Sequence, residues 1–90
     1  MRVSKSADST TIHIAGRFTF TRHREFKEAL AQVSGSLLVD LSETQCVDSA
    51  ALGLSLIARD AVGQITLSGA KDLVKETLAI ASFNKIFTIV

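Results

Sequence analysis

The chain has 90 residues, of which 47% are hydrophobic and 21% are charged. This composition is typical of a packed globular domain and excludes an intrinsically disordered chain. Ten basic and nine acidic residues leave a formal net charge of +1, so the overall charge does not support direct binding to nucleic acid. We therefore expect one domain that spans residues 1–90.

The single cysteine, Cys46, excludes an internal disulfide bond and fits a reducing compartment. The N-terminal residues contain no apolar run that could form the core of a signal peptide. No stretch approaches the roughly 18 consecutive apolar residues of a membrane span. The sequence therefore predicts a cytoplasmic protein that does not insert into a membrane.

Two hydrophobic periodicities alternate along the chain. Segments with alternating or continuous apolar residues are predicted strands, and they lie at 2–6, 11–16, 36–41, 64–69 and 86–90. Segments with three- and four-residue apolar spacing are predicted helices, and they lie at 21–33, 49–62 and 71–83. The pattern predicts an α/β domain with a mixed, largely parallel sheet of four to five strands, an antiparallel edge and about three helices.

Several local expectations follow from this pattern. The run Leu37-Leu38-Val39 predicts a strand covered on both faces, and 42–47 is expected to be a loop. Gly35 and Gly63 are placed to end the first two helices.

The histidines, the cysteine and the glycines show no pattern of a reactive centre. His13 is expected to face solvent as the polar member of its strand, and Cys46 to be a passive loop residue, with a histidine partner for it as the alternative. No metal-ligand spacing, nucleotide-binding glycine pattern or nucleophile–base pair is present in the sequence. We expect no enzymatic activity, no metal and no cofactor.

The segment Asp48-Ser49-Ala50-Ala51-Leu52-Gly53 is the most informative one, because Asp and Ser favour a helix start. The core side of the helix is predicted to comprise Ala50, Leu54, Ile57, Ala58 and Ala61. The opposite side comprises Ser49, Leu52, Gly53, Leu56, Arg59 and Asp60. Leucines beside a serine on that side, and a glycine that costs about 1 kcal/mol in a helix interior, predict a contact surface.

The segments Val39-Asp40-Leu41-Ser42 and Val47-Asp48-Ser49-Ala50-Ala51-Leu52-Gly53 resemble the signature of anti-sigma-factor antagonists. These proteins belong to the sulfate transporter and anti-sigma factor antagonist (STAS) domain family. Weaker similarity at 14–20 and 84–89 extends the resemblance to nearly the whole chain. It implies a single STAS-like domain at 1–90.

The resemblance also implies a function, namely partner switching. The unmodified domain binds a serine-kinase anti-sigma factor and thereby frees the sigma factor. Phosphorylation of the domain by that kinase separates the pair, and a phosphatase resets the system. The phosphate carries about −1.5 to −2 charges into a close contact, which is consistent with separation.

On this sequence the serine that matches the family's phosphorylation site is Ser49. The resemblance implies a partner-binding surface that consists of Asp48, Leu52, Gly53, Leu56, Thr19, Phe20 and His23. Thr19 stands where the family often has an acidic residue, and Arg17, Arg22 and His23 are expected to compensate.

The chain ends at Val90, where many relatives carry a further C-terminal helix. We therefore expect a fold without that helix and an apolar edge that is open to a partner or to weak homodimerisation.

A second function remains open. Some single-domain STAS proteins are accessory subunits of lipid-transport ABC complexes, and the same helix face would then dock permanently on an ATPase subunit. Genomic neighbours separate the two interpretations, because a kinase or phosphatase-regulator gene favours the switch and transporter genes favour the subunit.

Overall fold

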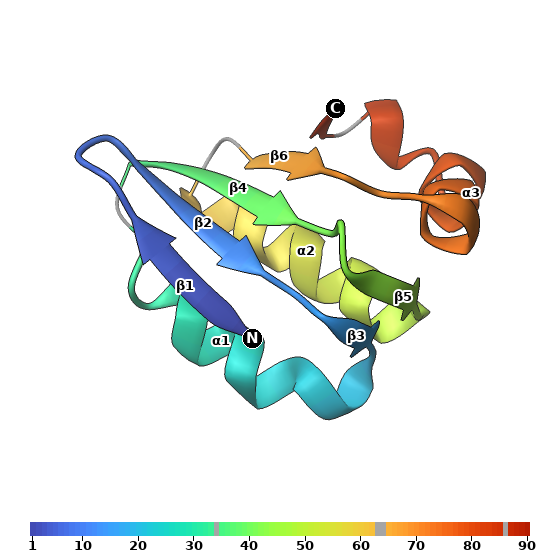
Figure 1. Cartoon of the computed structure of the whole chain (residues 1–90), viewed down its shortest axis with the longest axis horizontal. Coiled ribbons are helices and arrows are strands. Elements are labelled where there is room, and N and C mark those ends of the chain that lie inside the picture. Colours follow the sequence, from blue (N-terminus) through green and yellow to red (C-terminus); the bar gives the residue numbers. More distant parts are fainter. Residues whose placement is uncertain (34, 63–64, 86) are drawn as a thin grey trace.

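The computed structural model describes residues 1–33, 35–62, 65–85 and 87–90. Across these residues the main sheet has five strands, which lie side by side in the order β1 (Arg2–Lys5), β2 (Ser9–His13), β4 (Ser36–Asp40), β6 (Ile65–Ser68) and β7 (Thr88–Ile89) (Figure 1). β1 pairs antiparallel with β2, and the other neighbours are parallel. The predicted mixed, largely parallel sheet with an antiparallel edge is confirmed.

The helical elements are η1 (Phe20–Arg22), α1 (His23–Leu30), α2 (Ser49–Val62), α3 (Asp72–Ile80) and η2 (Phe83–Lys85), where η marks a 3-10 helix. Figure 1 shows α1 and α2 together behind the sheet and α3 at its end beyond β6. The predicted bounds of α2 are confirmed. The predictions for the other two helices are too long. The 3-10 helix η1 replaces the first predicted turn before α1. α3 ends at Ile80, and Ser82 shortly after it has a positive φ of 59°, which an α-helix does not allow.

A second, two-stranded parallel sheet joins β3 (Gly16–Phe18) to β5 (Thr44–Val47). The prediction of a loop at 42–47 is therefore wrong over β5. Thr44 is buried, and its hydroxyl donates a hydrogen bond to the carbonyl oxygen of Ile14 over 2.6 Å. A strand this short shows no periodicity of its own and depends on pairing with a distant segment. The pairing places the residues that follow β3 beside the start of α2.

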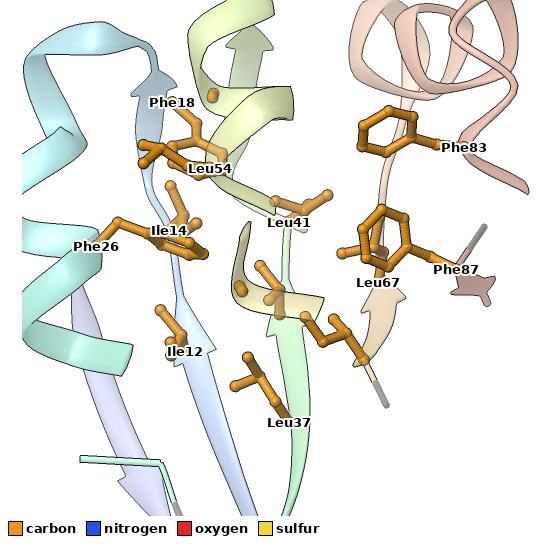
Figure 2. Packing of buried hydrophobic residues seen from close by; sticks show 14 of the residues in the cluster. Ile12, Ile14, Phe18, Phe26, Leu37, Leu41, Leu54, Leu67, Phe83 and Phe87 are labelled. Carbon is orange, nitrogen blue, oxygen red and sulfur yellow. The ribbon is translucent and has the colours of Figure 1, made fainter. Parts of the chain in front are cut away.

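The hydrophobic core lies between one face of the main sheet and the helices. Figure 2 shows Ile12 of β2, Ile14 just after β2, Phe26 of α1 and Leu54 of α2 among its members. In β4, Leu37 and Val39 are buried, whereas Leu38 on the opposite face is only half-buried. The prediction of a strand covered on both faces is wrong, because α1 and α2 lie on the same side of the sheet (Figure 1).

The core-facing side of α2 also differs from the prediction. Ala51, Leu54 and Ala58 are buried, but Ile57 is 57% exposed and Ala50 is half-buried. Ser55 takes up part of the core side, and its hydroxyl donates to the carbonyl oxygen of Ala51 over 3.1 Å. A serine whose hydroxyl bonds within its own helix can be buried at low cost. The sequence prediction considered only the apolar residues, so it placed Ile57 on the core side and left Ser55 out.

Some expectations fall on residues that the structure does not describe. These are the helix end at Gly63, the strand starts at Gln64 and Ile86, and the burial of the Ala61 side chain. α1 ends at Leu30, well before Gly35. None of the helices within the described residues combines the length and the hydrophobicity that a membrane span requires.

Candidate partner-binding site

Asp48 caps the N-terminus of α2 with one carboxylate oxygen and contacts η1 with the other. The backbone N–H of Ala51 donates to Oδ1 over 2.8 Å, which satisfies one of the first-turn donors that have no partner inside the helix. The backbone N–H of Phe20, 28 positions earlier in the chain, donates to Oδ2 over 3.0 Å. In addition, the N–H of Asp48 donates to the carbonyl oxygen of Phe18 over 3.3 Å. Asp48 thus links α2 to the segment that follows β3.

Ser49 is the first residue of α2, and its side chain is exposed. The cap is Asp48, so the hydroxyl of Ser49 is not needed to start the helix. Because the N–H groups in the first turn of a helix have no acceptor inside it, an added anion is stabilised there. The sequence-predicted phosphorylation site is therefore accessible and chemically suited to carry a phosphate.

One side of α2 exposes apolar side chains, and together with Ser49 it defines the α2 face: Ser49, Leu52, Gly53, Leu56 and Ile57. Leu56 is 39% exposed and Ile57 is 57% exposed, whereas Leu52 is half-buried against the core. The sequence analysis missed Ile57, which it placed in the core. Ile57 follows Gly53 by four residues and Ser49 by eight, and this helical spacing could have placed it on the same side of α2 as those two residues.

Gly53 lies half-exposed on the α2 face without a structural need for glycine. Among the described residues, a Cβ added there would meet nothing within 4 Å outside the helix's own backbone, and Gly53 is not among those with positive φ. Alanine would therefore fit the free chain and favour the helix by about 1 kcal/mol. The fold alone does not explain the glycine.

The η1 turn brings the other predicted contact residues to the start of α2. Phe20 is 69% exposed, and its ring stacks on that of His23 with centroids 6.2 Å apart and an interplanar angle of 19°. Thr19 is half-buried, and its hydroxyl lies 3.0 Å from that of Thr21. The structure thus gathers Phe20, His23, Asp48 and the α2 face around the contact between η1 and α2.

The basic residues expected to compensate for Thr19 are not equivalent. Arg22 is half-buried, and its guanidinium donates to the carbonyl oxygen of Ala15 over 3.0 Å and lies 3.8 Å from Glu25. Arg17 is exposed on β3. Arg22 therefore stabilises the turn from within, and Arg17 is the cation presented to solvent.

A separate polar group lies where β2 and β4 end. Nδ1 of His13 lies 2.9 Å from Oδ2 of Asp40, and its Nε2 lies 3.4 Å from the hydroxyl of Ser4. The N–H of Ser42 donates to Oδ1 of Asp40 over 2.9 Å, and this bond is the main reason why the pKa of Asp40 lies below its ordinary value. His13 is half-buried and paired, so the prediction of a solvent-facing histidine is wrong. His13, Asp40 and Ser42 border a hollow of about 110 Å³.

Cys46 lies half-buried in β5 rather than in a loop. Among the described residues, no three His, Cys, Asp or Glu side chains are grouped closely enough to hold a metal ion.

Comparisons with known proteins agree with the overall fold. The family model described as "Mlab, STAS domain" matches residues 1–90. A STAS-domain containing protein of Pseudomonas aeruginosa strain UCBPP-PA14 is 37% identical in an alignment 93 residues long, gaps included, that covers 96% of this chain and 92% of that protein. A crystal structure of a proposed anti-sigma factor antagonist from Thermotoga maritima superimposes with a TM-score of 0.86 at 15% identity, covering 98% of this chain and 83% of that one.

Proposed function

We propose that the chain, which belongs to the STAS domain family, is an anti-sigma-factor antagonist that works by partner switching. Its α2 face and the η1 turn that carries Phe20 (the Phe20 turn) dock on a serine-kinase anti-sigma factor, and this binding releases the sigma factor. That kinase phosphorylates Ser49, the complex separates, and a phosphatase restores the unmodified chain. The chain has no catalytic turnover of its own in this scheme.

Gly53 is the observation that carries the docking proposal. A glycine in the middle of an exposed helix face lowers helix stability, and no atom of the residues that the structure describes, beyond the helix's own backbone, lies within 4 Å of a Cβ built there. A partner that packs closely against α2 at this point gives the glycine a role. The exposed Leu56 and Ile57 on the same face would be desolvated in that contact, which stabilises the complex.

The position of Ser49 supports the phosphorylation step. Its side chain is exposed at the first turn of α2, on the same face as Gly53 and Leu56. A phosphate there is stabilised by the helix N-terminus, so the modified chain remains folded. In the complex, the same phosphate would bring about −1.5 to −2 charges between apolar surfaces, and burying those charges without a cationic partner is unfavourable.

Phosphorylation-site mapping tests the proposal. The purified chain is incubated with ATP and each serine-kinase anti-sigma factor encoded in the same genome, and the modified residue is identified by mass spectrometry. We expect phosphate on Ser49 in the wild type and none in Ser49→Ala. Phosphate on Ser42 or Ser55 instead would overturn the assignment, and Ser55 is an informative control because it is buried.

The same experiment separates the switch from the accessory-subunit function. A subunit of a lipid-transport ABC complex would use the α2 face without phosphorylation. It would then remain bound to an ATPase subunit whether or not ATP is present, and no kinase would label Ser49.

A further inference from the structure

We propose that Asp48 is a positioning residue that transmits phosphorylation of Ser49 to the Phe20 turn, and this inference rests on the proposed function. In the unmodified chain its carboxylate anchors η1 to the start of α2. A phosphate on the neighbouring Ser49 displaces that carboxylate and releases Phe20. The modification thus alters the docking surface itself, in addition to placing charge on it.

The anchor consists of one rigid group with two contacts. Oδ1 accepts from the N–H of Ala51 in α2, and Oδ2 accepts from the N–H of Phe20 in η1. Both oxygens belong to the same planar carboxylate, so a rotation of the Asp48 side chain breaks or strains both bonds together. Asp48 is half-buried, whereas Ser49 and Phe20 are exposed.

A phosphate on Ser49 would compete directly with the Asp48 carboxylate. Both anions favour the same N–H donors in the first turn of α2. The phosphate carries more charge and offers three acceptor oxygens, and it repels the adjacent carboxylate. When Asp48 moves away, the helix N-terminus keeps an anionic cap, but the N–H of Phe20 loses its acceptor.

The released segment is part of the docking surface. Phe20 is 69% exposed and stacks on His23, so its orientation depends on the turn that Asp48 holds. Release exposes an N–H group to water and allows the ring to reorient. A partner that recognises Phe20 and the α2 face together then meets two surfaces that are no longer fixed relative to each other.

The test uses the full chain with phosphoserine installed at position 49 during synthesis, so no kinase is needed. NMR then follows the amide proton of Phe20 in that protein, in the unmodified chain, in Asp48→Asn and in Ser49→Ala. The single carbonyl oxygen of Asp48→Asn can cap Ala51, because Asn caps helices as well as Asp does, but its NH2 group cannot accept from Phe20. The amide of Gly16 in β3, which donates to the carbonyl oxygen of Glu43, reports whether the surrounding fold is intact.

We expect the Phe20 amide proton to shift upfield and to exchange with solvent about tenfold faster in the phosphoserine protein and in Asp48→Asn. Ser49→Ala should resemble the unmodified chain, and the Gly16 amide should stay constant throughout. An unchanged Phe20 amide in the phosphoserine protein would overturn the transmission, even if a kinase labels Ser49 and the proposed function holds. If no kinase labels Ser49, the proposed function fails, while release of Phe20 in the phosphoserine protein would still support the role of Asp48.

Discussion

Leu54 and Leu56 lie two residues apart on α2 and have opposite environments, because Leu54 is 4% exposed in the core and Leu56 is 39% exposed on the α2 face. Figure 2 shows Leu54 among the buried side chains of the core. The pair separates the contribution of α2 to folding from its contribution to binding, since the same substitution can be made at both positions.

Leu56→Gln should weaken partner binding by about 1–3 kcal/mol and change the free energy of unfolding by only a few tenths of a kcal/mol. Leu54→Gln should lower the free energy of unfolding by about 2–5 kcal/mol, because it places an unpaired amide in the core. Urea unfolding measures the stabilities, and calorimetric titration with the serine-kinase anti-sigma factor measures binding. Equal destabilisation by the two substitutions would show that Leu56 belongs to the core and not to an interface.

Gly53→Ala should act in opposite directions on folding and binding. Within the described ranges of the chain, the added methyl group meets no atom within 4 Å beyond the helix's own backbone, so the helix should gain up to about 1 kcal/mol of stability. The same methyl group would separate α2 from a partner that packs on Gly53, so the affinity should fall. A variant that is more stable and binds equally well would remove the main support for close packing at this position.

Ser49→Ala should leave the fold intact. Asp48 supplies the helix cap, so the expected loss of stability is a few tenths of a kcal/mol. The variant should also bind the kinase whether or not ATP is present, because the phosphoacceptor is missing. Size-exclusion chromatography of the mixture with and without ATP gives the result, and the wild type, which should separate from the kinase only with ATP, is the control.

Asp40 should make stability dependent on pH at the acidic end. Its pKa in the folded chain is lowered from 3.8, mainly by the N–H of Ser42 and further by His13, so the folded state favours the ionised form. The resulting stabilisation is fully present above the unfolded-state pKa and is lost as the pH falls through the lower, folded-state pKa.

Asp40→Asn provides the comparison for this effect. At neutral pH it should be about 1–3 kcal/mol less stable than the wild type, because hydrogen bonds to a charged acceptor are lost. The difference should shrink as the pH falls below about 4. Urea unfolding at a series of pH values measures it, and a difference that stays constant across the acidic range would show that the Asp40 charge does not contribute.

The sequence was sufficient to place α2 but not to orient it. Asp48 and Ser49 mark its start locally, so its N-terminus could be read from the chain. Its core side depends on tertiary packing, which buries Ser55 and leaves Ile57 exposed. Apolar periodicity cannot distinguish an interface residue from a core residue, because both are hydrophobic.

Contacts between segments that are distant along the chain could not be predicted from the sequence either. β5 exists through its pairing with β3, and the bond from Phe20 to Asp48 spans 28 positions. The sequence analysis nevertheless included Phe20 and His23, which the structure places near the start of α2, in the predicted partner surface, but it did not include Ile57. Their geometric connection through the Asp48 carboxylate came only from the structure.

The most direct test of partner switching is the dissociation constant of the kinase complex with and without phosphate on Ser49. Isothermal titration calorimetry compares the unmodified chain with the phosphoserine protein, both in the absence of ATP. We predict that the phosphate weakens binding by on the order of 100-fold, which corresponds to about 2.7 kcal/mol. Equal dissociation constants for the two proteins would contradict phosphorylation-controlled partner switching at Ser49.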